Sequence, residues 1–197
     1  MAIKPIIQIG DIRLKEKNKL LNISDYKMVK SAVANLIDTM LKNDIVGIAA
    51  PQIGENIKLF ITEPRETEYR KADQADELRV YINPKITEYS KEKSTIYEGC
   101  GSVGADFFGP VERPKQITIE AYNQEFKKFR LTCDGMLARV IQHEFDHLSG
   151  IEFVEKISDY KKVMNFDNYQ KQVRTSTKQI AESKISLLKY IEIDEKL

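Results

Sequence analysis

Two histidines stand four residues apart in segment 142–150, and a glutamate follows the first: His143, Glu144 and His147. On an α-helix this spacing places both imidazoles on one face, one turn apart, where they can bind the same metal ion. Glu144 would be rotated by about 100° around the helix axis, so that its carboxylate lies beside the metal and can take a proton from a bound water. Two core histidines satisfied by hydrogen bonds are the alternative. The intervening glutamate favours the metal site, because metal-assisted hydrolysis needs all three groups.

The segment around these residues has the pattern of a mostly buried helix. Its apolar side chains recur at helical spacing and form a wide face, made by Met136, Leu137, Val140, Ile141, Phe145 and Leu148. Asp134 is a candidate N-cap and Gly150 a candidate stop. The histidines continue the apolar stripe, so we expect the helix to point its ligands into the core.

Composition limits the class of protein and of partner. The chain has 197 residues, which is typical of one domain, and 42% of them are hydrophobic, as in a soluble globular protein. Its 31 basic and 30 acidic residues leave a formal charge of +1, so there is no direct nucleic-acid signature. The N-terminus lacks the pattern of a signal peptide, and no apolar run reaches the roughly 20 residues of a membrane span. We therefore expect a cytoplasmic protein with reduced thiols.

Several flanking segments have recognisable periodicity. An amphipathic helix is predicted over 24–42, with Ser24 as its cap, and a strand over 58–62. Segments 80–82 and 85–87 read as extended and broken at Asn83-Pro84, and alternation predicts a hairpin from 116–123 and 127–133 that leads into the metal helix. Beyond residue 156 a weak helical pattern returns at Ile180, Ile185, Leu188 and Ile191.

A catalytic divalent metal usually has three protein ligands, and the chain has two histidines. The third must be Cys, Asp or Glu. Zinc peptidases with a longer H-E-x-x-H motif would place a third histidine at position 153, which here is Phe153. Glu152 and Glu155 lie too close to His147 for the arrangement in which a glutamate from a second helix completes the site.

A cysteine is the better third ligand. Cys100 is flanked by Gly99 and Gly101, so the backbone can present its thiol in a crowded place. Metal binding would keep that thiol as a thiolate. Cys133 is the competitor, although it is expected to end a strand with its side chain packed, and a pairing of the two cysteines is the further alternative.

Three segments together resemble the motifs of the peptide deformylases, in order and in spacing. They are Gly-Ile-Ala-Ala-Pro-Gln at 47–52, Glu-Gly-Cys-Gly-Ser at 98–102 and Gln-His-Glu-Phe-Asp-His at 142–147. The resemblance covers roughly 5–155 and includes Val-Glu-Arg-Pro at 111–114. It implies an α+β fold with antiparallel strands wrapped around the central H-E-x-x-H helix. Residues 1–155 would form the catalytic domain, and 156–197 a partly helical C-terminal extension.

The resemblance also implies a reaction and a metal. The ion would be Fe(II), replaceable by Zn(II), Ni(II) or Co(II), held by Cys100, His143 and His147. The substrates would be N-formylmethionyl peptides, as nascent chains at the ribosome, and the products formate and a free amine. One thiolate and two imidazoles leave the ion a net positive charge, which lowers the pKa of a bound water towards about 7.

The remaining site residues follow from the same resemblance. Glu144 would accept the proton of the attacking water and pass it to the leaving amine. The oxyanion would be met by the Gln52 amide and the Gly101 backbone N–H. Substrate contacts are expected from the residues Val46, Gly47, Glu98, Gly99, Arg113 and Arg139.

Three positions depart from the family pattern. Ile45 stands where the first motif usually has a glycine, and Gly101 replaces a leucine, which should make its loop more flexible. Arg139 takes a place that helps to line the apolar methionine pocket, and we expect its stem to cover apolar surface while the guanidinium reaches water. These departures motivate a second hypothesis, a divergent member with weak activity or altered substrate that acts as a binding module. A zinc metallopeptidase is the third hypothesis.

Overall fold

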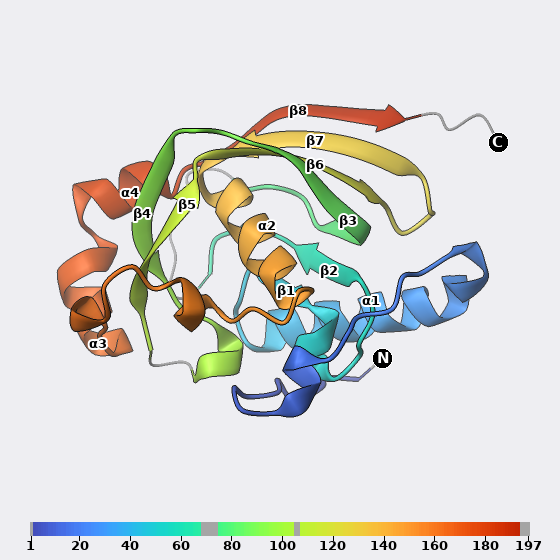
Figure 1. Cartoon of the computed structure of the whole chain (residues 1–197), viewed down its shortest axis with the longest axis horizontal. Coiled ribbons are helices and arrows are strands. Elements are labelled where there is room, and N and C mark those ends of the chain that lie inside the picture. The colour runs from blue at the N-terminus through green and yellow to red at the C-terminus, as the bar shows by residue number, and fades with distance from the viewer. Residues whose placement is uncertain (1, 68–74, 105–106, 194–197) are drawn as a thin grey trace.

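The computed structural model describes residues 2–67, 75–104 and 107–193 and has an α+β fold built around one helix. That helix, α2 (Gly135–His147), contains the H-E-x-x-H segment. Figure 1 shows strands curving around α2, while the longer helix α1 (Tyr26–Lys42) lies beyond the first two strands. The predicted fold class is therefore confirmed. In the part of the chain that is described, no helix is long and apolar enough to cross a membrane.

The main sheet has six strands, all paired antiparallel, in the order β1-β2-β3-β6-β7-β8. Their bounds are β1 (Gly47–Ala49), β2 (Leu59–Thr62), β3 (Arg79–Tyr89), β6 (Gln116–Tyr122), β7 (Lys128–Asp134) and β8 (Ile185–Ile193). The predicted hairpin is present as β6 and β7, with Ile119 opposite Leu131. Both side chains are fully buried in one apolar core with Leu137 and Ile141 of α2. The apolar residues that alternate along β6 and β7 therefore lie on the face of the sheet that packs against α2.

Glycines set both ends of α2. Gly135 has φ +56°, and a Cβ atom built there would lie 2.0 Å from the carbonyl oxygen of Lys184, so no other residue fits. Asp134 occupies the predicted N-cap position, but its side chain makes no capping hydrogen bond within the described chain. Gly150 has φ +68°, and its N–H donates to the carbonyl of His147 at 3.1 Å, as the predicted stop requires.

The predicted break at Asn83-Pro84 is wrong, because β3 continues through it. The pairing of β3 with β6 shifts register between Ile82 and Lys85, which marks a β-bulge. Asn83 adopts φ +49°, and its amide exchanges two hydrogen bonds with the backbone of Leu21, at 2.6 and 2.9 Å. The bulge thus accommodates the proline without ending the strand.

A separate two-stranded sheet forms from β4 (Lys93–Glu98) and β5 (Gly109–Pro114). Figure 1 shows the β4–β5 hairpin to the left of α2, whereas the turn between β6 and β7 lies to the right of that helix. The motif at 98–102 begins at the last residue of β4, and the motif at 111–114 lies in β5. The periodicity of the sequence did not predict either strand. The chain enters the 3-10 turn that contains Gly101 directly from the end of β4.

Helix α1 begins two residues later than predicted. Ser24 lies in a 3-10 turn, and the side chain of Asn22 accepts a hydrogen bond from its backbone N–H at 3.0 Å. The prediction of Ser24 as the cap is therefore wrong: Asn22 caps the 3-10 turn that leads into α1, and Asp25 occupies the N-cap position of α1 itself. The buried side chains of α1 include Val29, Val33, Leu36 and Met40, which recur at the spacing of one helical face.

The C-terminal extension is partly helical, as predicted, but it ends in a strand. After the 3-10 turn Phe153–Lys156, which spans the predicted boundary, it contains the 3-10 turn Tyr160–Lys162, α3 (Phe166–Tyr169), a π-helical turn at Gln170–Arg174 and α4 (Thr177–Glu182). Ile180 lies in α4, whereas Ile185, Leu188 and Ile191 belong to β8, so the helical pattern is wrong for these three.

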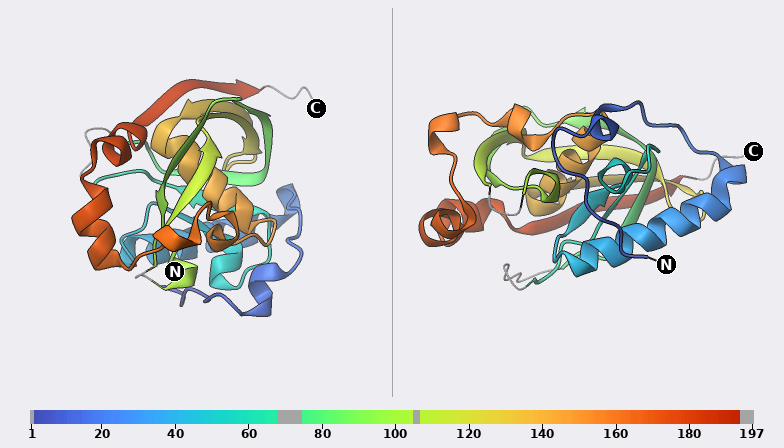
Figure 2. Two further views of the ribbon diagram at one scale, coloured as in Figure 1. Left: turned by 60° about the vertical axis from the view of Figure 1, so that its left-hand side comes forward. Right: turned by 90° about the horizontal axis from the view of Figure 1, so that it is seen from below.

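Pairing with β7 explains the strand. Figure 2 shows the short helices gathered at one end of the molecule and β8 running along the outside of the sheet. Tyr190 of β8 stacks on Phe129 of β7, with ring centroids 5.4 Å apart. This cross-strand packing outweighs a weak local helical periodicity. The domain boundary at residue 155 stays a prediction, and the extension shares the main sheet with the rest of the chain.

Candidate metal centre

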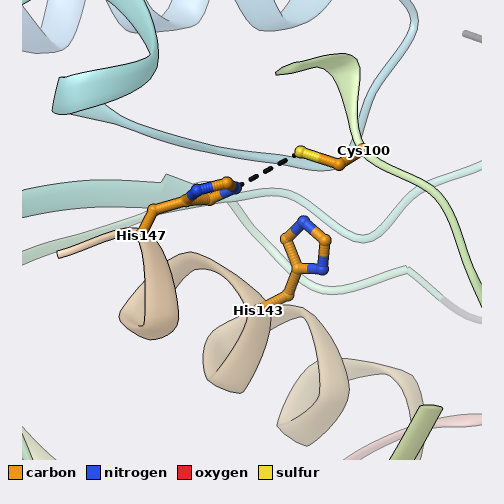
Figure 3. Close-up of side chains that lie close together, drawn as sticks. All are labelled: Cys100, His143 and His147. Atoms are coloured by element: carbon orange, nitrogen blue, oxygen red, sulfur yellow. Dashed lines mark hydrogen bonds between the residues drawn. The ribbon is translucent and has the colours of Figure 1, made fainter. Parts of the chain in front are cut away.

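Cys100, His143 and His147 meet in the interior, as the sequence predicts. One potential ligand atom from each lies within 4.8 Å of the other two, and Cys100 Sγ is 3.3 Å from His147 Nε2. Figure 3 shows the two imidazoles rising from successive turns of α2 towards the sulfur, which comes from the loop after β4. Cys100 and Cys133 are both free thiols, and Cys133 is buried in β7, so the alternative of a disulfide is wrong.

A carboxylate lies near the Nδ1 atom of each histidine. His143 Nδ1 is 3.0 Å from Glu98 Oε2, and His147 Nδ1 is 3.5 Å from Glu152 Oε2. The His143 contact is a hydrogen bond, which fixes the ring orientation and favours the tautomer that leaves Nε2 for a metal, whereas the His147 contact is longer and is not a hydrogen bond. The sequence predicted Glu98 as a substrate contact and set Glu152 aside as a ligand. It gave no signal that either would face an imidazole.

Glu98 is the centre of a buried ion network. Arg113 donates to both of its carboxylate oxygens, at 2.7 and 3.0 Å, and Arg139 donates to Oε1 at 2.6 Å. Arg113 also donates to Asp146 at 2.7 Å, so its guanidinium links β5 to α2. Burial alone would raise the pKa of Glu98, but Arg113 and His143 outweigh it and hold that pKa well below the usual range.

The expectation that the Arg139 guanidinium reaches water is wrong. The residue is 6% exposed, and besides Glu98 its guanidinium donates to the carbonyl of Val111 and to the carbonyl and hydroxyl of Ser94, at 3.0 to 3.1 Å. A carboxylate and three oxygens of the β4–β5 hairpin thus satisfy a charge that sequence reasoning placed in solvent. Arg139 connects α2 to that hairpin.

The Cys100 loop is held from two sides. The Gln52 amide donates from Nε2 to Cys100 Sγ at 3.5 Å and to the Ser102 hydroxyl at 3.2 Å, while its Oε1 accepts from the backbone of Ala49 at 2.7 Å. The backbone N–H of Ser102 also donates to Sγ, at 3.4 Å. The sequence missed Ser102 as a site residue, although it is the last residue of the motif at 98–102.

The two glycines beside Cys100 have different roles. A Cβ atom on Gly99 would lie 2.7 Å from the Phe108 ring, so this close approach requires glycine. A Cβ atom on Gly101 would meet the flexible tip of Ile6 at 3.1 Å, so space alone does not require glycine there. The Gly101 carbonyl accepts a hydrogen bond from the Gln8 side chain at 2.9 Å, which ties the loop to the N-terminal segment.

Glu144 lies where a proton acceptor is needed. Burial raises its pKa to about 7, against the attraction of the two histidines, and its Oε2 has no hydrogen-bond partner in the described structure. Burial also disfavours the Cys100 thiolate, yet His147 and His143 outweigh this and lower the thiol pKa to about 6. The site therefore favours a thiolate beside the imidazoles and a carboxyl that can change its protonation near neutral pH.

The first motif packs directly on α2. Gly47 lies in β1, and a Cβ atom there would be 2.6 Å from Val140 and 2.8 Å from Glu144. The carbonyl of Val46, just before β1, accepts from the backbone of Glu63 at 2.8 Å. The structure thus places Gly47 beside Glu144 of α2. Contact of a peptide with Val46, Gly47, Glu98, Gly99, Arg113 or Arg139 stays a prediction.

Comparisons with known proteins indicate one family, the peptide deformylases. A family model described as polypeptide deformylase matches residues 3–163. The peptide deformylase of Christiangramia forsetii is 38% identical over 167 residues, which cover 81% of this chain and 84% of that protein. The peptide deformylase of Acinetobacter baumannii (strain SDF) is 35% identical over 175 residues, covering 88% of this chain and 94% of the relative.

Solved structures are similar over the same region. The Met-Ala-Ser-bound class I type b peptide deformylase from Acinetobacter baumannii has a TM-score of 0.74 and 31% identity, covering 79% of this chain and 99% of that one. The peptide deformylase from Thermotoga maritima has a TM-score of 0.69 and 31% identity, covering 81% of this chain and 100% of that one.

Proposed function

Because this chain belongs to the peptide deformylase family, and is thus a metal-dependent hydrolase that removes formyl groups from nascent peptides, we propose that Cys100, His143 and His147 hold its metal ion. The 3.3 Å approach of Cys100 Sγ to His147 Nε2, inside a cluster that also contains His143, is the observation that supports this assignment. The earlier hypotheses of a binding module and of a metallopeptidase are not favoured.

The donor set fits a first-row divalent ion. A thiolate and two neutral imidazoles are ligands that Zn(II) and Fe(II) accept, and the lowered pKa of the Cys100 thiol favours its ligating form. We propose Fe(II) as the ion, replaceable by Zn(II), Ni(II) or Co(II). A bound divalent ion would supply Lewis acidity and lower the pKa of a coordinated water.

Glu144 would move the proton. Its carboxylate is buried beside Gly47, and burial raises its pKa to about 7, so it can both accept and return a proton near neutral pH. We propose that Glu144 accepts the proton of the attacking water and later delivers that proton to the leaving amine. Since hydrolysis of the formyl amide yields formate and a free amine, one group that accepts and then donates is sufficient.

Gln52 and Gly101 would stabilise negative charge on the formyl oxygen. The Gln52 amide is fixed by the bond from the Ala49 backbone to its Oε1, so Nε2 is directed to the cysteine side of the site. The backbone N–H of Gly101 belongs to the loop that follows the same cysteine. Two preorganised donors of this kind lower the barrier of amide hydrolysis.

The peptide would add to the edge of the main sheet. Strand β1 ends the strand order, so its outer edge offers backbone groups to an extended chain. We propose that Val46 and Gly47 pair with an N-formylmethionyl peptide there. Glu98, Gly99, Arg113 and Arg139 would shape the neighbouring wall, with both arginines acting through Glu98. The substrates would be nascent chains emerging at the ribosome, which places the reaction in the cytoplasm.

Formate release tests this function. Anaerobically purified protein loaded with Fe(II) or Ni(II) should release formate from formyl-Met-Ala, because a thiolate-bound Fe(II) oxidises in air. Glu144→Ala should lose turnover while it retains metal, whereas Glu112→Ala, which removes an exposed carboxylate of β5, should leave the rate unchanged. Formate release at the wild-type rate by Glu144→Ala would contradict the assigned role.

A further inference from the structure

Glu152 is a fully buried carboxylate beside His147. Its exposed fraction is 0%, and neither carboxylate oxygen accepts a hydrogen bond from any residue of the described structure. Among the described residues, the ionisable side chain recorded within ion-pair distance is His147, whose Nδ1 lies 3.5 Å from Glu152 Oε2. Burial of a carboxylate without hydrogen bonds is unfavourable in general, so the presence of this side chain in the interior requires an explanation.

The position of Glu152 excludes it from the ligand set. His147 uses its two ring nitrogens in different directions: Nε2 is 3.3 Å from Cys100 Sγ, whereas Nδ1 is the atom nearest to Glu152. The carboxylate therefore approaches the imidazole from the side away from the sulfur. It can act on a metal only through His147.

The chain fixes the backbone that carries this carboxylate. After α2 the chain reverses at Gly150, and the backbone N–H of Ile151 donates to the carbonyl of Asp146 at 3.0 Å. The N–H of Glu152 donates to Glu155 Oε1 at 2.8 Å, and Lys15 binds both Gly150 O and Glu155 Oε1 at 2.6 Å. Because these bonds set the direction of residue 152, its carboxylate is preorganised against His147.

Glu98 provides the comparison within the same site. It faces the other histidine, but two arginines share its charge, so the network around His143 is compensated without a metal. Glu152 has no such cation among the described residues that contact it. A metal ion held by Cys100, His143 and His147 would supply the positive charge that Glu152 lacks among its described neighbours.

We propose that Glu152 is a positioning residue of the metal centre: with the ion bound, its carboxylate would accept a hydrogen bond from His147 Nδ1, leave Nε2 directed to the metal, and strengthen metal binding through its charge. A carboxylate that accepts from a ligating imidazole raises the basicity of the coordinating nitrogen and fixes the ring. The inference rests on the proposed metal assignment, and it adds a residue outside the three sequence motifs.

Metal affinity tests the proposal with full-length protein and Zn(II) as the probe. Metal-free protein would be titrated with Zn(II) against a competing chelator, for the wild type, Glu152→Leu and Glu152→Gln. Loss of the carboxylate should weaken Zn(II) binding by about 10- to 100-fold in Glu152→Leu, the usual effect of removing such a partner. Glu152→Gln should lose less, because its amide oxygen can still accept from Nδ1.

A control separates this effect from general loosening of the segment. Glu155→Gln removes the charge that pairs with Lys15 but keeps an amide oxygen that can accept from the Glu152 backbone, so it leaves the Glu152 carboxylate at His147 in place. Its Zn(II) affinity should equal that of the wild type. The absorption bands of the Co(II)-loaded protein should shift in both Glu152 variants and not in Glu155→Gln, since they report the ligand field at the metal.

The possible results are distinct. Wild-type Zn(II) affinity and unchanged Co(II) bands in Glu152→Leu would overturn the proposal, as would an equal loss in Glu155→Gln. If Glu152→Leu fails to fold, as circular dichroism would show, the isosteric Glu152→Gln decides the question by the same two measurements. Failure of the folded wild type itself to bind Zn(II) would instead contradict the proposed metal centre.

Discussion

Gly47 and Glu144 approach so closely that a Cβ atom on Gly47 would lie 2.8 Å from Glu144 Oε1 and 2.6 Å from Val140. Gly47→Ala should therefore push α2 or the Glu144 side chain away from its position. A displacement of this size should lower kcat/KM for formate release by about 10- to 100-fold. Gly101→Ala is the matched control, because its Cβ would meet only the mobile tip of Ile6, and it should keep most of the activity. Equal activities of the two variants would contradict the role assigned to Gly47.

The pH dependence of stability in the metal-free protein reports the Glu144 carboxyl. Burial raises its pKa from 4.5 to about 7, so the folded protein binds this proton more tightly than the unfolded chain does. Its contribution to stability is complete below about pH 4.5 and is lost as the pH rises through about 7. A shift of roughly 2.5 units corresponds to about 3 kcal/mol.

Glu144→Gln removes this titration. The stability of Glu144→Gln relative to the wild type should therefore increase between about pH 4.5 and about pH 8. Denaturant unfolding of both chelated proteins across this range measures the difference. Parallel pH profiles would show that Glu144 has no raised pKa in the folded protein.

Arg139→Leu should destabilise the protein, because it removes one of the cations that share the buried Glu98 charge. Breaking a buried ion pair typically costs about 3–5 kcal/mol, but Arg113 and His143 remain, so we expect about 2 kcal/mol. Arg130→Leu, which removes an exposed guanidinium from Glu120, should cost less than about 1 kcal/mol. Denaturant unfolding of both variants gives the comparison, and similar losses would argue against a structural role for Arg139.

Metal removal should lower thermal stability. An ion that binds the folded protein at about 100 times its Kd adds about 2.7 kcal/mol, which for a chain of this size corresponds to a Tm increase of roughly 5–10 °C. A chelator should remove this increment from the wild type and from Cys133→Ser, whose cysteine lies in β7 and outside the cluster. Cys100→Ser should show little response to the chelator. A normal response of Cys100→Ser would exclude its sulfur as a ligand.

Local periodicity is sufficient to predict a helix or strand that buries only one of its faces. The H-E-x-x-H helix and the β6–β7 hairpin were predicted because their apolar residues repeat at 3.6 and at 2, and both repeats face the same core. Cys100 was predicted as the third ligand from its flanking glycines, and the resemblance of three motifs supports the same choice. Spacing along the chain could not show that Cys100 meets the histidines, because 47 residues separate Cys100 from His147.

The missed features depend on contacts between distant segments. The strand β8 forms because β7 offers it a pairing edge, which no local pattern reports. The Arg139 charge is buried because Glu98 comes from another element to meet it. Glu152 faces His147 only because the chain reverses at Gly150, so its role is visible in three dimensions and not in the motif.

The two-stranded sheet of β4 and β5 has a consequence for the way in which the molecule opens. Cys100 lies two residues after the end of β4, and Arg139 of α2 binds both strands of this hairpin through Ser94 and Val111. Separation of the hairpin from α2 would therefore pull the sulfur out of the cluster and expose the guanidinium in one local unfolding event. Amide deuterium exchange in β4 and β5 should accordingly slow when the ion binds, while the central strands β6 and β7 keep the same rates.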